Sequence, residues 1–121
     1  DANSREWRYV PVRRYFLAFE KAVRDRMIDY VFHTNDANLW ENVRGMLTGF
    51  CLQQFKSGAL AGKNADEAFF VQVGQGETMT DMDILEGRLI VQIGLAVARP
   101  AEFIVLTFVH HMESDRMSIQ S

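Results

Sequence analysis

Residues 87–108 read GRLIVQIGLAVARPAEFIVLTF and predict two β-strands joined by a short connection. We place the strands at about 88–98 and about 102–112, because both runs are rich in β-branched and aromatic residues. Pro100 lacks an N–H donor, so we expect an open connection rather than a tight turn. A long apolar strand this late in a chain either pairs inside its own domain or is offered to another molecule.

Two helices are predicted ahead of these strands. Apolar residues recur with helical spacing from Val12 to Tyr30, which indicates a helix over about 11–31 with Pro11 in its first turn. A second helix is expected over about 37–57, where Gly45 and Gly49 lie four residues apart and predict the close approach of another backbone. The short loop between the helices favours an antiparallel hairpin.

The remaining elements complete an α+β fold class. A first strand is expected over 68–73, and a single helical turn over 81–85 is expected to be capped by Thr80. We therefore predict an N-terminal two-helix antiparallel hairpin packed on a small, mainly antiparallel three-stranded sheet, with a last strand able to pair with neighbouring subunits. Residues 1–8 are expected to form a flexible or extended entry segment, residues 9–112 the domain, and residues 113–121 a polar tail.

Composition limits the function classes. The chain has 121 residues, 48% of them hydrophobic and 24% charged, which is enough for one domain with its own core. The net charge of −3 gives no support to nucleic-acid binding. No apolar run approaches the roughly 18 residues that a membrane-spanning helix needs, so we expect no membrane insertion.

The charges are unevenly distributed along the chain. Residues 5–26 hold seven Lys or Arg, whereas residues 64–86 hold six acids and no Lys or Arg. Two such patches can meet each other or meet copies of themselves. The alternative interpretation is two ordinary solvated faces.

No motif predicts a catalytic, cofactor or metal site. The segment 58–64 resembles a phosphate-binding loop, but it has three residues between its glycines, lacks Ser or Thr after Lys63, and follows a helix. His110 and His111 are expected to point to opposite faces of a strand, so they cannot chelate one metal together. We interpret Cys51 as buried filler and Trp40 as either core or a partner contact.

Several short segments carry a resemblance to a known family. They read YVPVRR (9–14), NDANLW (35–40), GALAG (58–62), EAFFV (67–71), DMD (81–83), GRL (87–89) and RPAEF (99–103). In this order, over most of the chain, they resemble the C-terminal domain of contractile tail sheath proteins. These proteins occur in tailed phages, R-type pyocins and extracellular contractile injection systems.

The resemblance implies a structural, mechanical protein rather than an enzyme, with no cofactor and no metal. Sheath subunits of the family stack as hexameric rings in a helical polymer around an inner tube, and arms of neighbouring subunits add strands to this domain. A baseplate signal triggers contraction, which drives the tube through a target envelope. The implied partners are other copies of the chain, the inner tube protein and baseplate proteins. The implied location is assembly in the bacterial cytoplasm, as part of a phage tail or an extracellular contractile particle.

By this interpretation, residues 101–112 form the inter-subunit strand and the two earlier strands supply the acceptor sheet. The basic first helix and the acidic loop 77–86 would form charge-complementary contacts between subunits. The residues hypothesised to make inter-subunit contacts are Arg13, Arg14, Asp81, Asp83, Arg99, Glu102, Phe103, Val105, Thr107 and Val109.

Two other functions stay open at this point. One is a stand-alone baseplate or adaptor interaction module that uses the same strand addition. The other is a small cytosolic ligand-binding or enzyme domain, which would need a deep polar pocket with perturbed ionisable groups. The family's larger N-terminal part is missing from this sequence and residues 112–121 run past the match, so we expect either a sheath fragment or a divergent short relative.

Overall fold

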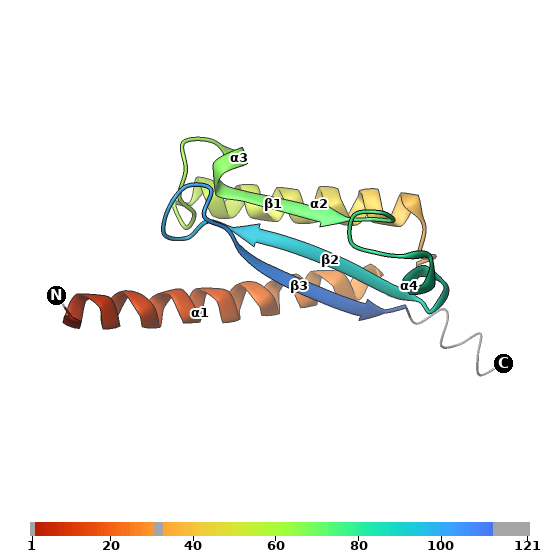
Figure 1. Cartoon of the computed structure of the whole chain (residues 1–121), viewed down its shortest axis with the longest axis horizontal. Coiled ribbons are helices and arrows are strands. Elements are labelled where there is room, and N and C mark those ends of the chain that lie inside the picture. Colours follow the sequence, from red (N-terminus) through yellow and green to blue (C-terminus); the bar gives the residue numbers. More distant parts are fainter. Residues whose placement is uncertain (1, 31–32, 113–121) are drawn as a thin grey trace.

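The computed structural model of the chain describes residues 2–30 and 33–112, with the backbone only for residues 2–11 (Figure 1). The predicted α+β fold class is confirmed. The elements are α1 (Ala2–Met27), a 3₁₀ turn (Ile28–Tyr30), α2 (Ala37–Lys56), α3 (Ala65–Ala68), β1 (Phe69–Val73), α4 (Asp81–Leu85), β2 (Arg88–Leu95) and β3 (Ile104–His111). The polar tail predicted for residues 113–121 lies outside the described residues.

The start of α1 differs from the prediction. The helix begins at Ala2 rather than near Pro11, so residues 2–8 are helical rather than extended, and the flexibility expected of this segment stays a prediction. A proline inside a helix removes one backbone hydrogen bond and strains the preceding turn, but it does not prevent helix on its N-terminal side. The residues before it include good helix formers, among them Arg5, Glu6 and Arg8.

The second helix has the predicted extent to within a residue. The Asp36 carboxylate caps α2 by accepting the Leu39 N–H at 3.0 Å, and Gly58 ends the helix with a φ of 89°. The close approach predicted at Gly45 and Gly49 is wrong. Both glycines are exposed, and a Cβ added at either would meet nothing within 4 Å.

Large side chains, rather than glycines, join the two long helices. The rings of Phe19 and Phe50 stack with centroids 5.2 Å apart, and the Tyr15 hydroxyl donates to Gln54 Oε1 at 2.9 Å. The Arg26 guanidinium lies 4.1 Å from the Phe50 ring centroid. In Figure 1 the two helices run in opposite directions. Aromatic side chains such as Phe19 and Phe50 fill the space between the two helices, so the helix backbones need not approach each other at glycines.

The sheet has the order β1-β2-β3 and both pairings are antiparallel. Phe69 lies opposite Leu95 at one end of the first pairing, and Arg88 lies opposite His111 at one end of the second. One face of the sheet is buried against both long helices. The buried set includes Phe19, Val23 and Met27 from α1, Leu39, Val43, Leu47 and Cys51 from α2, and Phe69, Val73, Leu89, Val91, Ile93, Leu95 and Phe108 from the sheet.

The opposite face of the sheet carries one tight contact. The Phe70 ring covers Gly94, so a Cβ added at Gly94 would lie 2.1 Å from Phe70 Cε2. The same ring meets Phe103 edge-on, with centroids 5.1 Å apart and an interplanar angle of 83°. The glycine in β2 therefore makes room for an aromatic pair that ties β1 to the residue before β3.

This arrangement predicts opposite effects for one chemical change at two glycines. Gly94→Ala should lower the free energy of unfolding by about 1–3 kcal/mol, because the Phe70 ring must move and lose its contact with Phe103. The control Gly45→Ala should raise it by about 0.5–1 kcal/mol, because the site is open and helical. Urea unfolding followed by circular dichroism measures both, and equal effects of the two changes would contradict the account.

Candidate interface at the edge of the sheet

β3 is an edge strand. β2 lies between β1 and β3, so both edges of β2 are already hydrogen-bonded within the chain. β2 is the central strand and has no unpaired edge, so a strand added to this sheet would pair with β1 or β3, and the acceptor sheet stays a prediction. Residues 104–111 do pair within their own chain, with β2, and this leaves the other edge of β3 without a strand among the described residues.

The register shows which backbone groups face that free edge. Met112 N–H donates to the Gly87 carbonyl at 2.8 Å, and Arg88 lies opposite His111. In an antiparallel ladder, hydrogen-bonded residues alternate along each strand. The even-numbered residues of β3 therefore bond to β2. The N–H and C=O groups of the odd-numbered residues Val105, Thr107 and Val109 point away from β2, toward the free edge.

The same three residues also form an exposed stripe on the outer face. Val105 is 49% exposed, Val109 is 50% exposed, and Thr107 between them is exposed as well. Their side chains share this face with Phe70 and with Ile90, away from the helices. Three of the predicted contact residues are thus brought together as one strip that offers both backbone groups and apolar side chains.

The connection between β2 and β3 holds three more predicted contact residues. Arg99 and Glu102 are both strongly exposed, and their charged groups lie 3.9 Å apart. The N–H of Ala101, which has a φ of 61°, donates to the Glu67 carbonyl at 2.8 Å. Phe103 is half-buried against Phe70 of its own chain. The strand itself begins only at Ile104, so the predicted start at residue 102 is two residues early.

The predicted charge contacts lie on other elements. Arg13 and Arg14 are exposed on α1, and Asp81 is exposed at the start of α4, where it accepts a hydrogen bond from the Gln75 side chain. Asp83 is different, because its carboxylate is bound inside the chain by Arg88. The structure does not bring these four residues together with the β3 edge.

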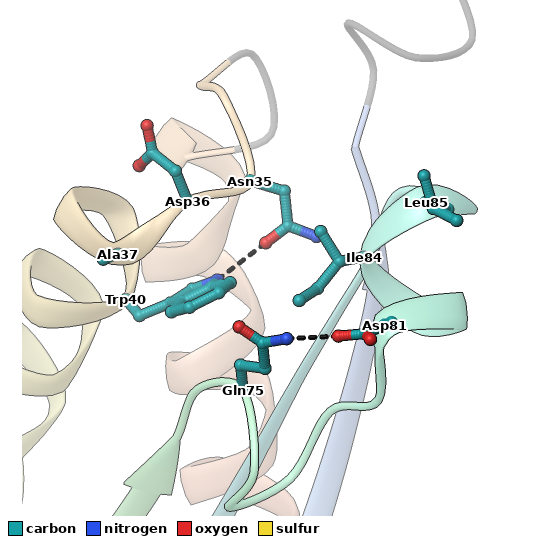
Figure 2. Close-up of a pocket in the computed structure, with 8 residues that line it drawn as sticks. All are labelled: Asn35, Asp36, Ala37, Trp40, Gln75, Asp81, Ile84 and Leu85. Carbon is teal, nitrogen blue, oxygen red and sulfur yellow. Dashed lines mark hydrogen bonds between the residues drawn. The ribbon is translucent and has the colours of Figure 1, made fainter.

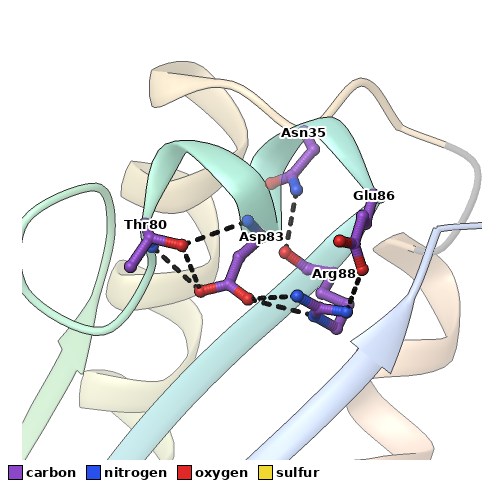
Figure 3. Close-up of polar contacts among 5 residues, drawn as sticks. All are labelled: Asn35, Thr80, Asp83, Glu86 and Arg88. Atoms are coloured by element: carbon purple, nitrogen blue, oxygen red, sulfur yellow. Dashed lines mark hydrogen bonds and ion pairs between the residues drawn. The ribbon is translucent and has the colours of Figure 1, made fainter.

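A polar cluster holds α4 onto the start of β2 (Figure 3). Thr80 Oγ1 accepts the Asp83 N–H at 3.2 Å, which confirms the predicted cap. In return, Asp83 Oδ2 accepts hydrogen bonds from the Thr80 N–H at 2.9 Å and the Thr80 hydroxyl at 3.0 Å. Asp83 Oδ1 accepts from Arg88 Nε at 3.0 Å and Arg88 Nη2 at 2.6 Å. Arg88 also pairs with Glu86. The cap and the Arg88 hydrogen bonds lower the pKa of the Asp83 carboxyl below its ordinary 3.8.

This cluster extends to the beginning of α2. The Asn35 side chain donates to the Arg88 carbonyl at 3.0 Å, and its oxygen accepts the Trp40 indole N–H at 2.7 Å. Sequence reasoning missed Asn35 as a bridge, because its partner is 53 positions away. Arg88, two positions beyond Glu86 and past the turn at Gly87, was a signal that the acids of α4 have a partner within the chain.

A pocket of about 530 Å³ lies beside Trp40 (Figure 2). Its lining comes from the start of α2, from Gln75, and from α4. Trp40 is half-buried and packs against the core while one part of its ring lines the pocket. Core packing, one of the two interpretations that the sequence left open, is therefore present, and a partner contact at Trp40 stays a prediction.

Burial shifts the pKa values of Cys51 and His110. Cys51 is fully buried, as predicted, and burial raises the pKa of its thiol to about 12. Burial, with smaller contributions from nearby Arg24 and His111, lowers the pKa of His110. Within residues 2–30 and 33–112, no three His, Cys, Asp or Glu side chains are grouped so that they could hold a metal ion. No helix in this part of the chain is long and apolar enough to cross a membrane.

Comparison with solved structures identifies the relatives of this fold. A chain in the six-fold symmetrised cryo-EM structure of the anti-feeding prophage (AFP) baseplate is 42% identical, with a TM-score of 0.71 over 84% of this chain and 28% of that chain. A chain in the PVC sheath complex of an extracellular contractile injection system, in its contracted state, is 41% identical, with a TM-score of 0.71 over 86% of this chain and 29% of that chain.

The chain is a relative of the contractile tail sheath proteins. A third match, in the AFP baseplate in its contracted state, has 42% identity and a TM-score of 0.68 over 81% of this sheath-like chain and 28% of that chain. The sheath-like chain thus spans less than a third of the length of these relatives. No family model and no curated protein matches it.

The polar cluster predicts a pH-dependent contribution from Asp83. Because its folded pKa is lowered, the ionised carboxylate stabilises the fold at neutral pH, and this contribution is lost as the pH falls from about 4 through the folded pKa. Asp83→Asn should therefore lower Tm at pH 7, and the difference from the unsubstituted protein should shrink with acidification.

Asp81→Asn is the matched control, because it removes a carboxylate of the same helix whose hydrogen bond comes from the neutral Gln75 side chain. Its effect on Tm at pH 7 should be smaller than that of Asp83→Asn. A Tm difference for Asp83→Asn that stays constant from pH 7 to pH 2 would contradict the assignment.

Proposed function

We propose that the chain is a structural subunit, or part of one, of a contractile tail sheath. In this proposal it polymerises as hexameric rings around an inner tube, and contraction of the polymer drives the tube through a target envelope. The observation that carries the proposal is a β3 edge with no strand against it among the described residues, on a chain that is 41% identical to a component of a PVC sheath complex in the contracted state.

The β3 edge suits a link between subunits that move. An added strand would bond to the backbone groups of Val105, Thr107 and Val109, and backbone hydrogen bonds tolerate side-chain changes in the incoming strand. Such a strand is held along its whole length, so the link survives while the subunit bodies rotate against one another. Under this proposal an arm of a neighbouring subunit supplies the strand, and the exposed side chains of Val105 and Val109 pack against it.

The partners follow from the same proposal. They are other copies of the chain, an inner tube protein and the baseplate, and assembly takes place in the bacterial cytoplasm before the particle acts outside the cell. A non-enzymatic role agrees with the protonated, fully buried Cys51 and with the solved relatives, which are components of contractile injection systems.

A second candidate is a stand-alone baseplate or adaptor module that accepts a strand in the same way. The observation that favours it is that two of the three solved relatives described above belong to AFP baseplate structures. The two candidates differ in the assembly they predict, since a sheath forms long tubes and a baseplate module does not.

The edge can be blocked with one substitution. Thr107→Pro removes an N–H that points to the free edge and spares the bonds between β3 and β2, because proline is tolerated where the N–H faces away from the ladder. With the tube and baseplate partners co-expressed, negative-stain electron microscopy should show hollow tubes for the unsubstituted protein and none for Thr107→Pro.

Thr107→Val is the matched control, because it keeps the N–H and the shape of the side chain, and it should assemble normally. Circular dichroism should show both variants folded. Normal tubes from a folded Thr107→Pro variant would rule out strand addition at this edge. Particles without tubes from the unsubstituted protein would favour the baseplate module.

A further inference from the structure

The pocket beside Trp40 has an apolar interior and an exposed apolar wall. Trp40 and Ile84 face each other across it, and Leu85 lies at its margin (Figure 2). Leu85 is 78% exposed, and Met82 on the same short helix is 59% exposed. Apolar surface gathered around a hollow in this way gains free energy when a partner covers it.

The rim of this pocket is polar and acidic. Asp81 contributes a carboxylate on one side, Asp36 lies on the other side with its carboxylate capping α2, and among the described residues no Lys or Arg lines the pocket. The Gln75 amide donates to Asp81 and leaves its negative charge uncompensated. An occupant should therefore be apolar at its centre and positively charged around it.

α1 carries a surface of that description. Leu17 is 66% exposed, and none of the pocket's lining residues comes from α1, so Leu17 does not fill the pocket of its own chain. Helical spacing places Arg13 and Arg14 one turn before Leu17 and Lys21 one turn after it. Arg14 is exposed, and Lys21 is 79% exposed while it pairs with Asp25 at 3.0 Å. Such an exposed pair is weak and leaves the lysine available to a partner.

We propose that Leu17 of one copy inserts into the pocket beside Trp40 of a second copy, with Arg14 facing the acidic rim at Asp81. This deepens the sheath proposal and rests on it. Leu17 and the pocket lie on different parts of one chain, so the contact joins two different surfaces and is heterologous. Repetition of a heterologous contact produces a ring or an open helical polymer rather than a closed dimer. The contact is separate from the β3 edge, so each copy would be held to its neighbours in two ways.

Disulfide cross-linking tests the contact directly. The double variant Leu17→Cys with Leu85→Cys places one thiol on each side of the proposed contact. Both positions are exposed, and the native Cys51 is fully buried with a raised thiol pKa, so it contributes little background. Mild oxidation of assembled particles should give a ladder of linked oligomers on a denaturing gel without reductant.

The control pairs Lys56→Cys, at the exposed end of α2, with Leu85→Cys, and it should give no ladder. Intact particles of the first variant that give no ladder would overturn the contact and leave the sheath proposal standing. Absence of particles from the unsubstituted protein would overturn the sheath proposal itself. In that case the Leu17→Cys, Leu85→Cys double variant is oxidised as concentrated soluble protein. A ladder of linked oligomers supports the contact, and absence of the ladder overturns it.

Substitutions that introduce no cysteine, and so no disulfide, give a second test. Leu17→Ser should weaken assembly about 10-fold or more, as expected for the loss of one buried leucine. Arg14→Glu should also weaken it, and Asp81→Arg in the same chain should restore part of the loss by reversing the pair. Unchanged assembly of folded Leu17→Ser protein, measured by sedimentation, would overturn the contact.

Discussion

The structure depends on the position of β2 between two antiparallel neighbours. The alternation of its backbone hydrogen bonds commits this strand to β1 on one side and β3 on the other. Its buried side chains, Val91 and Ile93 among them, bind the sheet to both long helices. Because the helices cover only one face, residues 2–30 and 33–112 leave the outer face and the far edge of β3 open. A fold of this size can bury its core without using that edge, which leaves the edge available for assembly.

Much of this architecture could be predicted from the chain because the signals are local. The periodic apolar residues of α2, the cap at Thr80 and the left-handed Gly58 each act within a few residues, and the structure has all three. The start of α1 could not be predicted in the same way. Pro11 is a strong local signal for a helix start, but residues on its N-terminal side are still free to continue the helix.

The non-local features needed the structure. Nothing near Gly94 in the sequence indicates that the Phe70 ring covers it, and nothing near Asn35 indicates a bond to Arg88. The order of the strands was also undetermined, because the sequence does not say which strand lies in the centre. That order bears on the candidate interface because β2 has no free edge, and the register of β3 turns its odd-numbered residues outward. The pocket beside Trp40 likewise exists only because α2 and α4 meet there.

Amide hydrogen exchange tests the central claim, the open edge of β3, most directly. The neighbouring amides of Thr107 and Phe108 should differ in the free protein, with Phe108 protected by its bond to β2 and Thr107 exchanging fast. In the assembled particle Thr107 should become protected together with Val105 and Val109, while Phe108 changes little. A Thr107 amide that is already as slow as Phe108 in the free protein, or one that stays fast in the particle, would contradict the account.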